Sequence, residues 1–157
     1  TLQGPVAVIN LMGRVFMPPV DCPFQEANRL LKNLDSNVRM IFVDFHAEAT
    51  SEKVAMGWHL DGRVSAVIGT HTHIQTADER VLPQGTAFLS DAGMTGPADS
   101  VIGIKTSIAV GKFLSGIPNR FEVSGGRGQI NGVLVEVNPE SGRANSILRI
   151  SEQEDSG

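Results

Sequence analysis

The sequence predicts an α/β fold in which β-α-β units are followed by antiparallel strands. Short apolar runs bounded by turn residues recur along the first two thirds of the chain, as expected of buried strands. Segments with helical spacing of apolar residues lie between these runs, and this alternation is typical of a parallel sheet. After Pro118 the strand-like runs are separated by glycine-containing turns, which favours antiparallel pairing.

The first unit begins with the apolar run 6–11, which predicts a buried strand. A helix follows, with Asp21 as its expected cap, Pro23 in its first turn and an end around residues 35–37. Apolar residues recur there at helical spacing: Phe24, Ala27, Leu30, Leu31 and Leu34. The run 40–45 is the next strand, so these elements form a β-α-β unit with parallel pairing.

A second helix begins at Thr50 or Ser51 and stops at residues 61–62, with Val54, Ala55 and Trp58 expected to face the sheet. The remaining elements are expected as follows: strands at 64–68, 86–89, 120–123, 132–137 and 146–150, a helix within 102–113, and turns at 81–85, 124–128 and 138–142. We expect one domain over residues 1–150 and a frayed acidic tail over residues 151–157.

Composition narrows the class of protein. A chain of 157 residues with 41% hydrophobic and 19% charged residues can bury one sizeable core. A net charge of −4 argues against stable nucleic-acid binding, and no apolar run approaches the length of a membrane span. With no signal peptide visible and Cys22 as the sole cysteine, we expect a cytoplasmic protein without internal disulfides.

Two of the predicted strands lead directly into histidines. His46 follows the run 40–45, while His71 and His73 follow the run 64–68. Open α/β sheets place ligand sites at such strand ends, and neutral imidazole is a common metal ligand. In extended backbone, residues two apart point to the same side, so His71 and His73 could reach one ion or one each of a close pair. The pattern therefore predicts a metal site formed by all three histidines.

Four nearby residues are candidates for supporting roles. Glu48 could orient His46 or a bound water, and Asp44 could contact a ligand histidine, although Glu48 is also explained as a solvated or helix-capping group. Asp91 and Gly93 could shape the wall of the pocket, but a loop that needs positive φ explains Gly93 equally well.

Two segments at this spacing, VDFHAEATSEK and GTHTH, resemble the YmdB-like metallophosphoesterases of the calcineurin-like phosphoesterase superfamily. The resemblance extends over nearly the whole chain, through AVINLMGRVFMPPVDCPF, SDAGMTGP at 90–97 and RFEVSGGRGQINGVLVEV at 120–137. It implies a sandwich of two β-sheets flanked by helices. Carried over by position, the histidine of DFHAE is His46 and those of GTHTH are His71 and His73, and all three would be metal ligands.

The resemblance also implies an activity. The family hydrolyses phosphodiester bonds, in this branch those of 2′,3′-cyclic nucleotides such as 2′,3′-cAMP, through a hydroxide activated by two metal ions. Iron or manganese is the expected metal, with zinc or magnesium as alternatives. Two cations about 3.5–4 Å apart suit this chemistry because they neutralise the charge on the phosphoryl oxygens.

The chain departs from the family at its start. The family's Asp-bearing GD-type motif, its Glu-Asn pair and its Gly-Asn-His segment are absent from the sequence. They supply a bridging carboxylate, further ligands and a histidine acid, so no catalytic acid can be assigned here. We therefore expect the C-terminal part of the family domain, incomplete as an enzyme by itself. Because a truncated domain exposes a sheet edge and core surface, we also expect a homo-oligomer.

Two other interpretations stay open at this point. The missing ligands would suit a non-catalytic domain that binds a ligand or a partner, with incidental histidines. Capsule-synthesis-type phosphoesterase-like proteins also carry a His-x-His after a strand, but that interpretation needs a cell-envelope address. The fourth histidine, His59, lies in a predicted helix and is expected to have a surface or supporting role.

Overall fold

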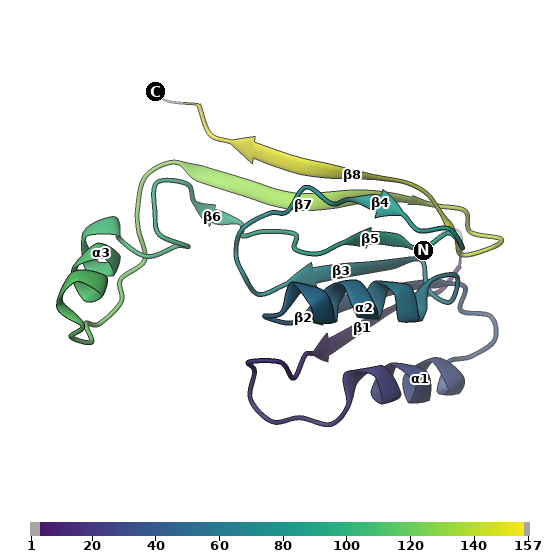
Figure 1. The fold of residues 1–157 in the computed structure, drawn as a ribbon. Coiled ribbons are helices and arrows are strands. Elements are labelled where there is room, and N and C mark those ends of the chain that lie inside the picture. The colour runs from purple at the N-terminus through teal and green to yellow at the C-terminus, as the bar shows by residue number, and fades with distance from the viewer. Residues whose placement is uncertain (1–3, 156–157) are drawn as a thin grey trace.

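The computed structural model describes residues 4–155 and places two helices, a five-stranded sheet and a three-stranded sheet in successive layers (Figure 1). A third helix, α3, stands outside these layers at one end of the molecule. The elements are β1 (Val6–Met12), α1 (Pro23–Asn33), β2 (Met40–His46), α2 (Thr50–Leu60), β3 (Ala66–Thr70), β4 (Arg80–Val81), β5 (Ala87–Leu89), β6 (Gly96–Pro97), α3 (Thr106–Ser115), β7 (Gly128–Val137) and β8 (Ala144–Gln153).

The five-stranded sheet has the strand order β1-β2-β3-β5-β4. β1, β2, β3 and β5 run parallel, and β4 pairs antiparallel with β5. This confirms the predicted β-α-β units. The register sets Met12 opposite His46, and His46 opposite Thr70. Three strands therefore end in one row, and the segments that follow them emerge side by side.

The larger part of the core lies between this sheet and the helices α1 and α2. Residues of β2 alternate between buried and half-buried, with Val43 and Phe45 buried toward the helices. α2 buries Met56 and Leu60, whereas Ala55 and Trp58, both expected to face the sheet, are exposed. These two predictions were wrong because the buried face of α2 is formed by residues 52, 53, 56, 57 and 60, with Gly57 against the ring of Phe88.

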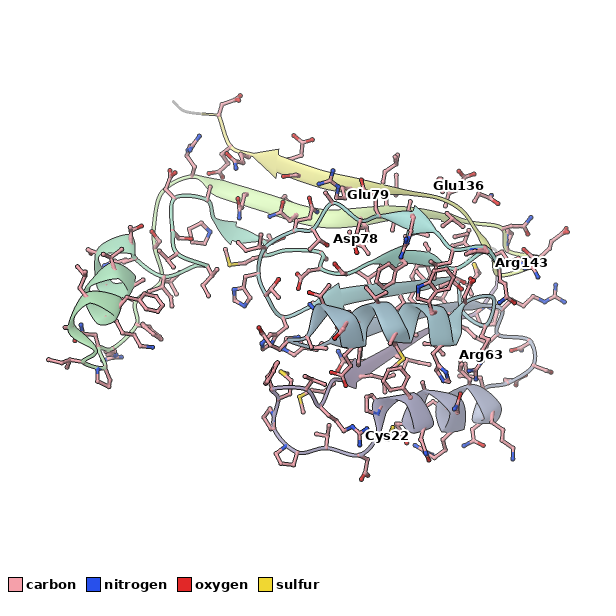
Figure 2. All side chains as sticks on the ribbon, viewed as in Figure 1. Cys22, Arg63, Asp78, Glu79, Glu136 and Arg143 are labelled. Atoms are coloured by element: carbon pink, nitrogen blue, oxygen red, sulfur yellow. The ribbon has the colours of Figure 1, made fainter. Side chains whose placement is uncertain are left out.

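The second sheet, ordered β6-β7-β8, covers the opposite face of the first. A smaller apolar cluster joins them, made of Ala66, Ala87, Leu89, Ala144 and Ile147. At the edge, Arg149 of β8 donates from Nε to Glu79 Oε1 at 2.8 Å. Glu79, labelled in Figure 2, stands just before β4. These contacts give a two-sheet sandwich with helices, in agreement with the expected fold class.

Three predictions in the last third were wrong. Residues 120–123 form no strand, because the segment that carries α3 is held instead by the isolated bridge between Ile104 and Val123. β7 consequently begins at Gly128, within the glycine-rich segment predicted as a hairpin turn. The tail is not frayed from residue 151, since Ser151 pairs with Asn131 and β8 continues to Gln153. Residues 156 and 157 of that tail lie outside the described residues.

Smaller differences concern helix ends. α1 ends at Asn33, before the expected 35–37, and its N-cap is Cys22, with no side-chain hydrogen bond from Asp21. Cys22 lies beside the start of α1 (Figure 2). Within residues 4–155, no helix is both long enough and apolar enough to cross a membrane.

Candidate metal centre

The rings of His46 and His71 meet at the ends of β2 and β3. His46 is the last residue of β2, and His71 follows the last residue of β3. His46 Nε2 and His71 Nδ1 are 3.0 Å apart, and the ring centroids are 4.8 Å apart in an edge-on arrangement. The parallel register therefore brings together two of the three histidines that the sequence singled out.

The contacts of His46 Nδ1 identify which ring nitrogen of His46 carries the proton. Thr70 donates its hydroxyl proton to Asp44 Oδ1 at 2.8 Å, and Asp44 Oδ2 accepts from Asn10 Nδ2 at 2.7 Å. The Thr70 oxygen, 3.0 Å from His46 Nδ1, is then left to accept. His46 Nδ1 therefore holds the proton, and Nε2 faces His71 as a lone pair.

His71 is held in the complementary state. Its Nε2 lies 2.9 Å from Glu48 Oε2, and a carboxylate can only accept, so Nε2 carries the proton and Nδ1 is a lone pair in the neutral ring. Two facing lone pairs at 3.0 Å repel each other unless a proton or a metal cation lies between them. Two nitrogens bound to one ion at about 2.0–2.1 Å lie about 2.8–3.4 Å apart over the range from octahedral to tetrahedral angles, and the observed 3.0 Å falls within that range. The donor set and its spacing thus fit a transition-metal ion held by His46 and His71.

His73 is oriented separately from this pair. Its exposed ring donates from Nδ1 to the carbonyl of Ile102 at 3.2 Å, which leaves Nε2 as a lone pair. The backbone φ is +115° at His71 and +68° at His73. The argument that extended backbone sends both rings to one side was therefore wrong, because the chain bends after Thr70. Within residues 4–155, no group of three His, Cys, Asp or Glu side chains is assembled to hold a metal ion.

Asp91 lies behind the histidine loop and not along an open wall. Its side chain is buried, and Oδ2 accepts from Lys53 Nζ at 2.7 Å, from Thr72 N at 3.0 Å and from Thr72 Oγ1 at 2.8 Å. Oδ1 accepts from the backbone N–H of Gly93 at 2.9 Å, and Gly93 has a φ of +80°. Burial raises the pKa of the Asp91 carboxyl, but the hydrogen bonds from Lys53, Gly93 and Thr72 hold that pKa below its ordinary value of 3.8.

The sequence reasoning missed Lys53, Thr70 and Thr72. A lysine in an amphipathic helix is normally solvated, so its burial was unexpected. One signal was available, since Lys53 shares the face of α2 with Met56 and Leu60 at helical spacing. His59 lies elsewhere, with Nε2 3.0 Å from Asn28 Oδ1 of α1.

Comparison with known proteins agrees with this architecture. Residues 1–150 match the model of the family described as YmdB-like protein. The chain is 49% identical over 145 residues to a protein of Bacillus subtilis (strain 168) named 2′,3′-cyclic-nucleotide 2′-phosphodiesterase, and the match covers 92% of this chain and 55% of that protein. The chain thus spans about half the length of the curated relatives it matches.

Two solved structures have the same fold. One is a protein from Thermus thermophilus, with a TM-score of 0.91 at 39% identity over 97% of this chain and 59% of the other. The second is a phosphatase from Mycoplasma pneumoniae, with a TM-score of 0.89 at 36% identity over 98% of this chain and 55% of the other. Since the family model covers almost every residue, including both histidine segments, the chain belongs to the YmdB-like family.

Proposed function

We propose that the complete protein carrying this chain is a metal-dependent phosphodiesterase that hydrolyses 2′,3′-cyclic nucleotides. The observation that carries the proposal is the approach of His46 Nε2 and His71 Nδ1 to 3.0 Å at the ends of two parallel strands. The name of the Bacillus subtilis relative supports the substrate class.

In this proposal His46, His71 and His73 are the metal ligands that this chain contributes. Iron or manganese is the expected metal, with zinc or magnesium as alternatives, and two ions are expected in the complete site. Such cations would stabilise charge on the phosphoryl oxygens and lower the pKa of a water. Glu48 and Thr70 hold the outer ring protons of His71 and His46, so that the inner nitrogens stay available.

Three further parts of the proposal concern the catalytic acid, the oligomeric state and the cellular compartment. We assign no catalytic acid to a residue of this chain. We also propose a homo-oligomer, since large apolar side chains such as Phe113 and Leu114 of α3 are exposed. The proposed compartment is the cytoplasm, supported by the unpaired Cys22.

The test uses the protein expressed from its complete gene. The purified protein is stripped with a chelator, reloaded with Mn²⁺ and assayed with 2′,3′-cAMP. We expect hydrolysis to return with Mn²⁺, and to fall at least about 100-fold in His46→Ala and His71→Ala. His59→Ala is the matched control and should retain the wild-type rate, because His59 contacts α1. A wild-type rate no higher than that of His71→Ala would contradict the proposal.

A second candidate is a non-catalytic domain that binds a ligand or a partner. It is favoured by one observation, namely that His73 is hydrogen-bonded to Ile102 and not to the other two rings. Calorimetric titration of the protein expressed from its complete gene with Mn²⁺ separates the two candidates. Stoichiometric binding that is lost in His71→Ala supports the metal site, and absence of binding in the wild-type protein supports the second candidate.

A further inference from the structure

A buried ion pair lies directly behind the histidine loop. Lys53 of α2 and Asp91 after β5 are 2% and 1% exposed, and Lys53 Nζ is 2.7 Å from Asp91 Oδ2. Buried ion pairs lose so much hydration that apolar side chains of similar volume often stabilise a protein equally well or better. Stability alone is therefore a poor explanation for placing these two charges inside the molecule.

The contacts of Asp91 converge on the turn that carries two of the histidines. Thr72, which stands between His71 and His73, donates to Asp91 from both its backbone nitrogen and its hydroxyl. The Asp91 carbonyl accepts from the backbone N–H of Thr76 at 3.1 Å. One residue thus anchors both the middle and the end of the turn.

That turn has a backbone conformation that needs such an anchor. Left-handed φ values are uncommon outside glycine, and here they occur at His71 (+115°) and at His73 (+68°). Strained conformations of this kind persist only where the surroundings fix them. β3 also approaches the neighbouring segment closely, since a Cβ on Gly69 would lie 1.8 Å from the Ser90 carbonyl oxygen and 2.9 Å from Lys53 Cδ.

We propose that the Lys53–Asp91 ion pair positions the metal ligands, by holding the Thr72 turn so that His71 and His73 present their unprotonated nitrogens to the metal site. The inference rests on the proposed function in taking these histidines as ligands. Lys53 and Asp91 would act on the metal site only through Thr72, so both are positioning residues.

The charge of Asp91 is required by its hydrogen-bond pattern. Both carboxylate oxygens accept, one from Lys53 and Thr72 and the other from the Gly93 N–H. An asparagine has one accepting oxygen, and its amide nitrogen would meet another donor. Lys53 in turn supplies the positive charge without which a buried carboxylate would be unpaired.

The test compares Asp91→Asn with Asp61→Asn in the protein expressed from its complete gene. Asp61 is also a buried carboxylate, but it caps the opposite end of α2 and accepts from the backbone of Gln84 at 3.0 Å and of Thr86 at 3.4 Å. Imidazole ¹⁵N–¹H spectra of the metal-free protein report ring positions and protonation, and calorimetry with Mn²⁺ reports affinity. Thermal unfolding measures any general loss of stability.

We expect both variants to unfold at lower temperature than wild type. Only Asp91→Asn should shift the His71 and His73 resonances and weaken Mn²⁺ binding, by at least about tenfold. Unchanged resonances and affinity in Asp91→Asn, or equal changes in Asp61→Asn, would overturn the proposal. If Asp91→Asn does not fold, Thr72→Val removes one of the anchoring bonds, and a wild-type spectrum in that variant would overturn it equally.

These readouts separate the inference from the proposed function. Neither measurement needs a substrate, so a wild-type protein that binds Mn²⁺ but does not hydrolyse 2′,3′-cAMP refutes the function and leaves the positioning role testable. A wild-type protein that binds no Mn²⁺ refutes both.

Discussion

Each histidine of the candidate centre donates one ring proton to a fixed acceptor and presents its other nitrogen as a lone pair. The acceptors are Thr70 for His46, Glu48 for His71 and the carbonyl of Ile102 for His73. The acceptors are a hydroxyl, a carboxylate and a carbonyl. Three different kinds of acceptor thus leave each ring with one protonated and one unprotonated nitrogen. In the proposed metal site, this arrangement would leave one nitrogen of each ring available to a cation.

Replacement of Glu48 tests this arrangement at a single residue. Glu48→Ala removes the acceptor that keeps the His71 proton on Nε2, and we expect Mn²⁺ affinity to fall by about 10- to 100-fold. The free energy of unfolding should change little, because the Glu48 side chain is 48% exposed. Calorimetric titration measures the affinity. Glu122→Ala, which removes an exposed partner of Lys105 on the segment carrying α3, is the control and should bind Mn²⁺ as wild type does.

The lowered pKa of Asp91 makes a prediction about acid stability. The pKa of the Asp91 carboxyl is lower in the folded than in the unfolded state. Such a group contributes its full stabilisation when the pH is above the pKa of the unfolded state. This contribution is lost as the pH falls through the folded pKa, below about pH 4. Urea unfolding of wild type and Asp91→Asn between about pH 6 and pH 3 should therefore show a difference in unfolding free energy that is largest at the upper end and shrinks below about pH 4. A constant difference would contradict the assignment.

At the scale of elements, apolar periodicity was enough to predict β1, β2 and both helices that cover the sheet. The meeting of His46 with His71 also followed from the sequence, because parallel strands end at one edge. The orientation of His73 did not follow, since it depends on a left-handed φ and on Ile102, which is 29 residues away. No local pattern encodes such a contact.

The close approach of β3 to the segment after β5 explains why glycine is needed at position 69. In Gly69→Ala the new Cβ would lie 1.8 Å from a backbone oxygen of Ser90, so the two segments must separate. We expect the free energy of unfolding to fall by about 3 kcal/mol or more. Chemical denaturation provides the measurement.

Gly111→Ala in α3 is the matched control for that substitution. A Cβ at Gly111 meets no atom within 4 Å, and alanine favours a helix over glycine by about 1 kcal/mol. We therefore expect the control to be neutral or slightly more stable. Equal stability of the two variants would show that the close approach of Ser90 does not require glycine at position 69.

At the scale of the whole molecule, the two apolar clusters differ in extent, and the smaller one joins the sheets. The outer face of the second sheet keeps Leu134 and Leu148 largely exposed. In the described part of the chain β1 is also an edge strand of the larger sheet. Exposed apolar surface and an unpaired strand edge both favour association with another chain.

The edge of β1 offers the sharper test of association, because strand pairing there can be blocked with a single charge. Val8 is 75% exposed in the middle of β1, and lysine on an edge strand opposes pairing with a second edge. We expect the chain produced alone to exceed its monomer mass of 16.8 kDa in light scattering, increasingly with concentration, and Val8→Lys to return it toward that mass. Leu114→Lys on α3 adds the same charge at an exposed apolar position away from the sheet, and should leave association through β1 intact. The opposite result, in which Leu114→Lys dissociates the chains and Val8→Lys does not, would place the contact on α3. A charge on β1 is tolerated only if no second chain covers that strand.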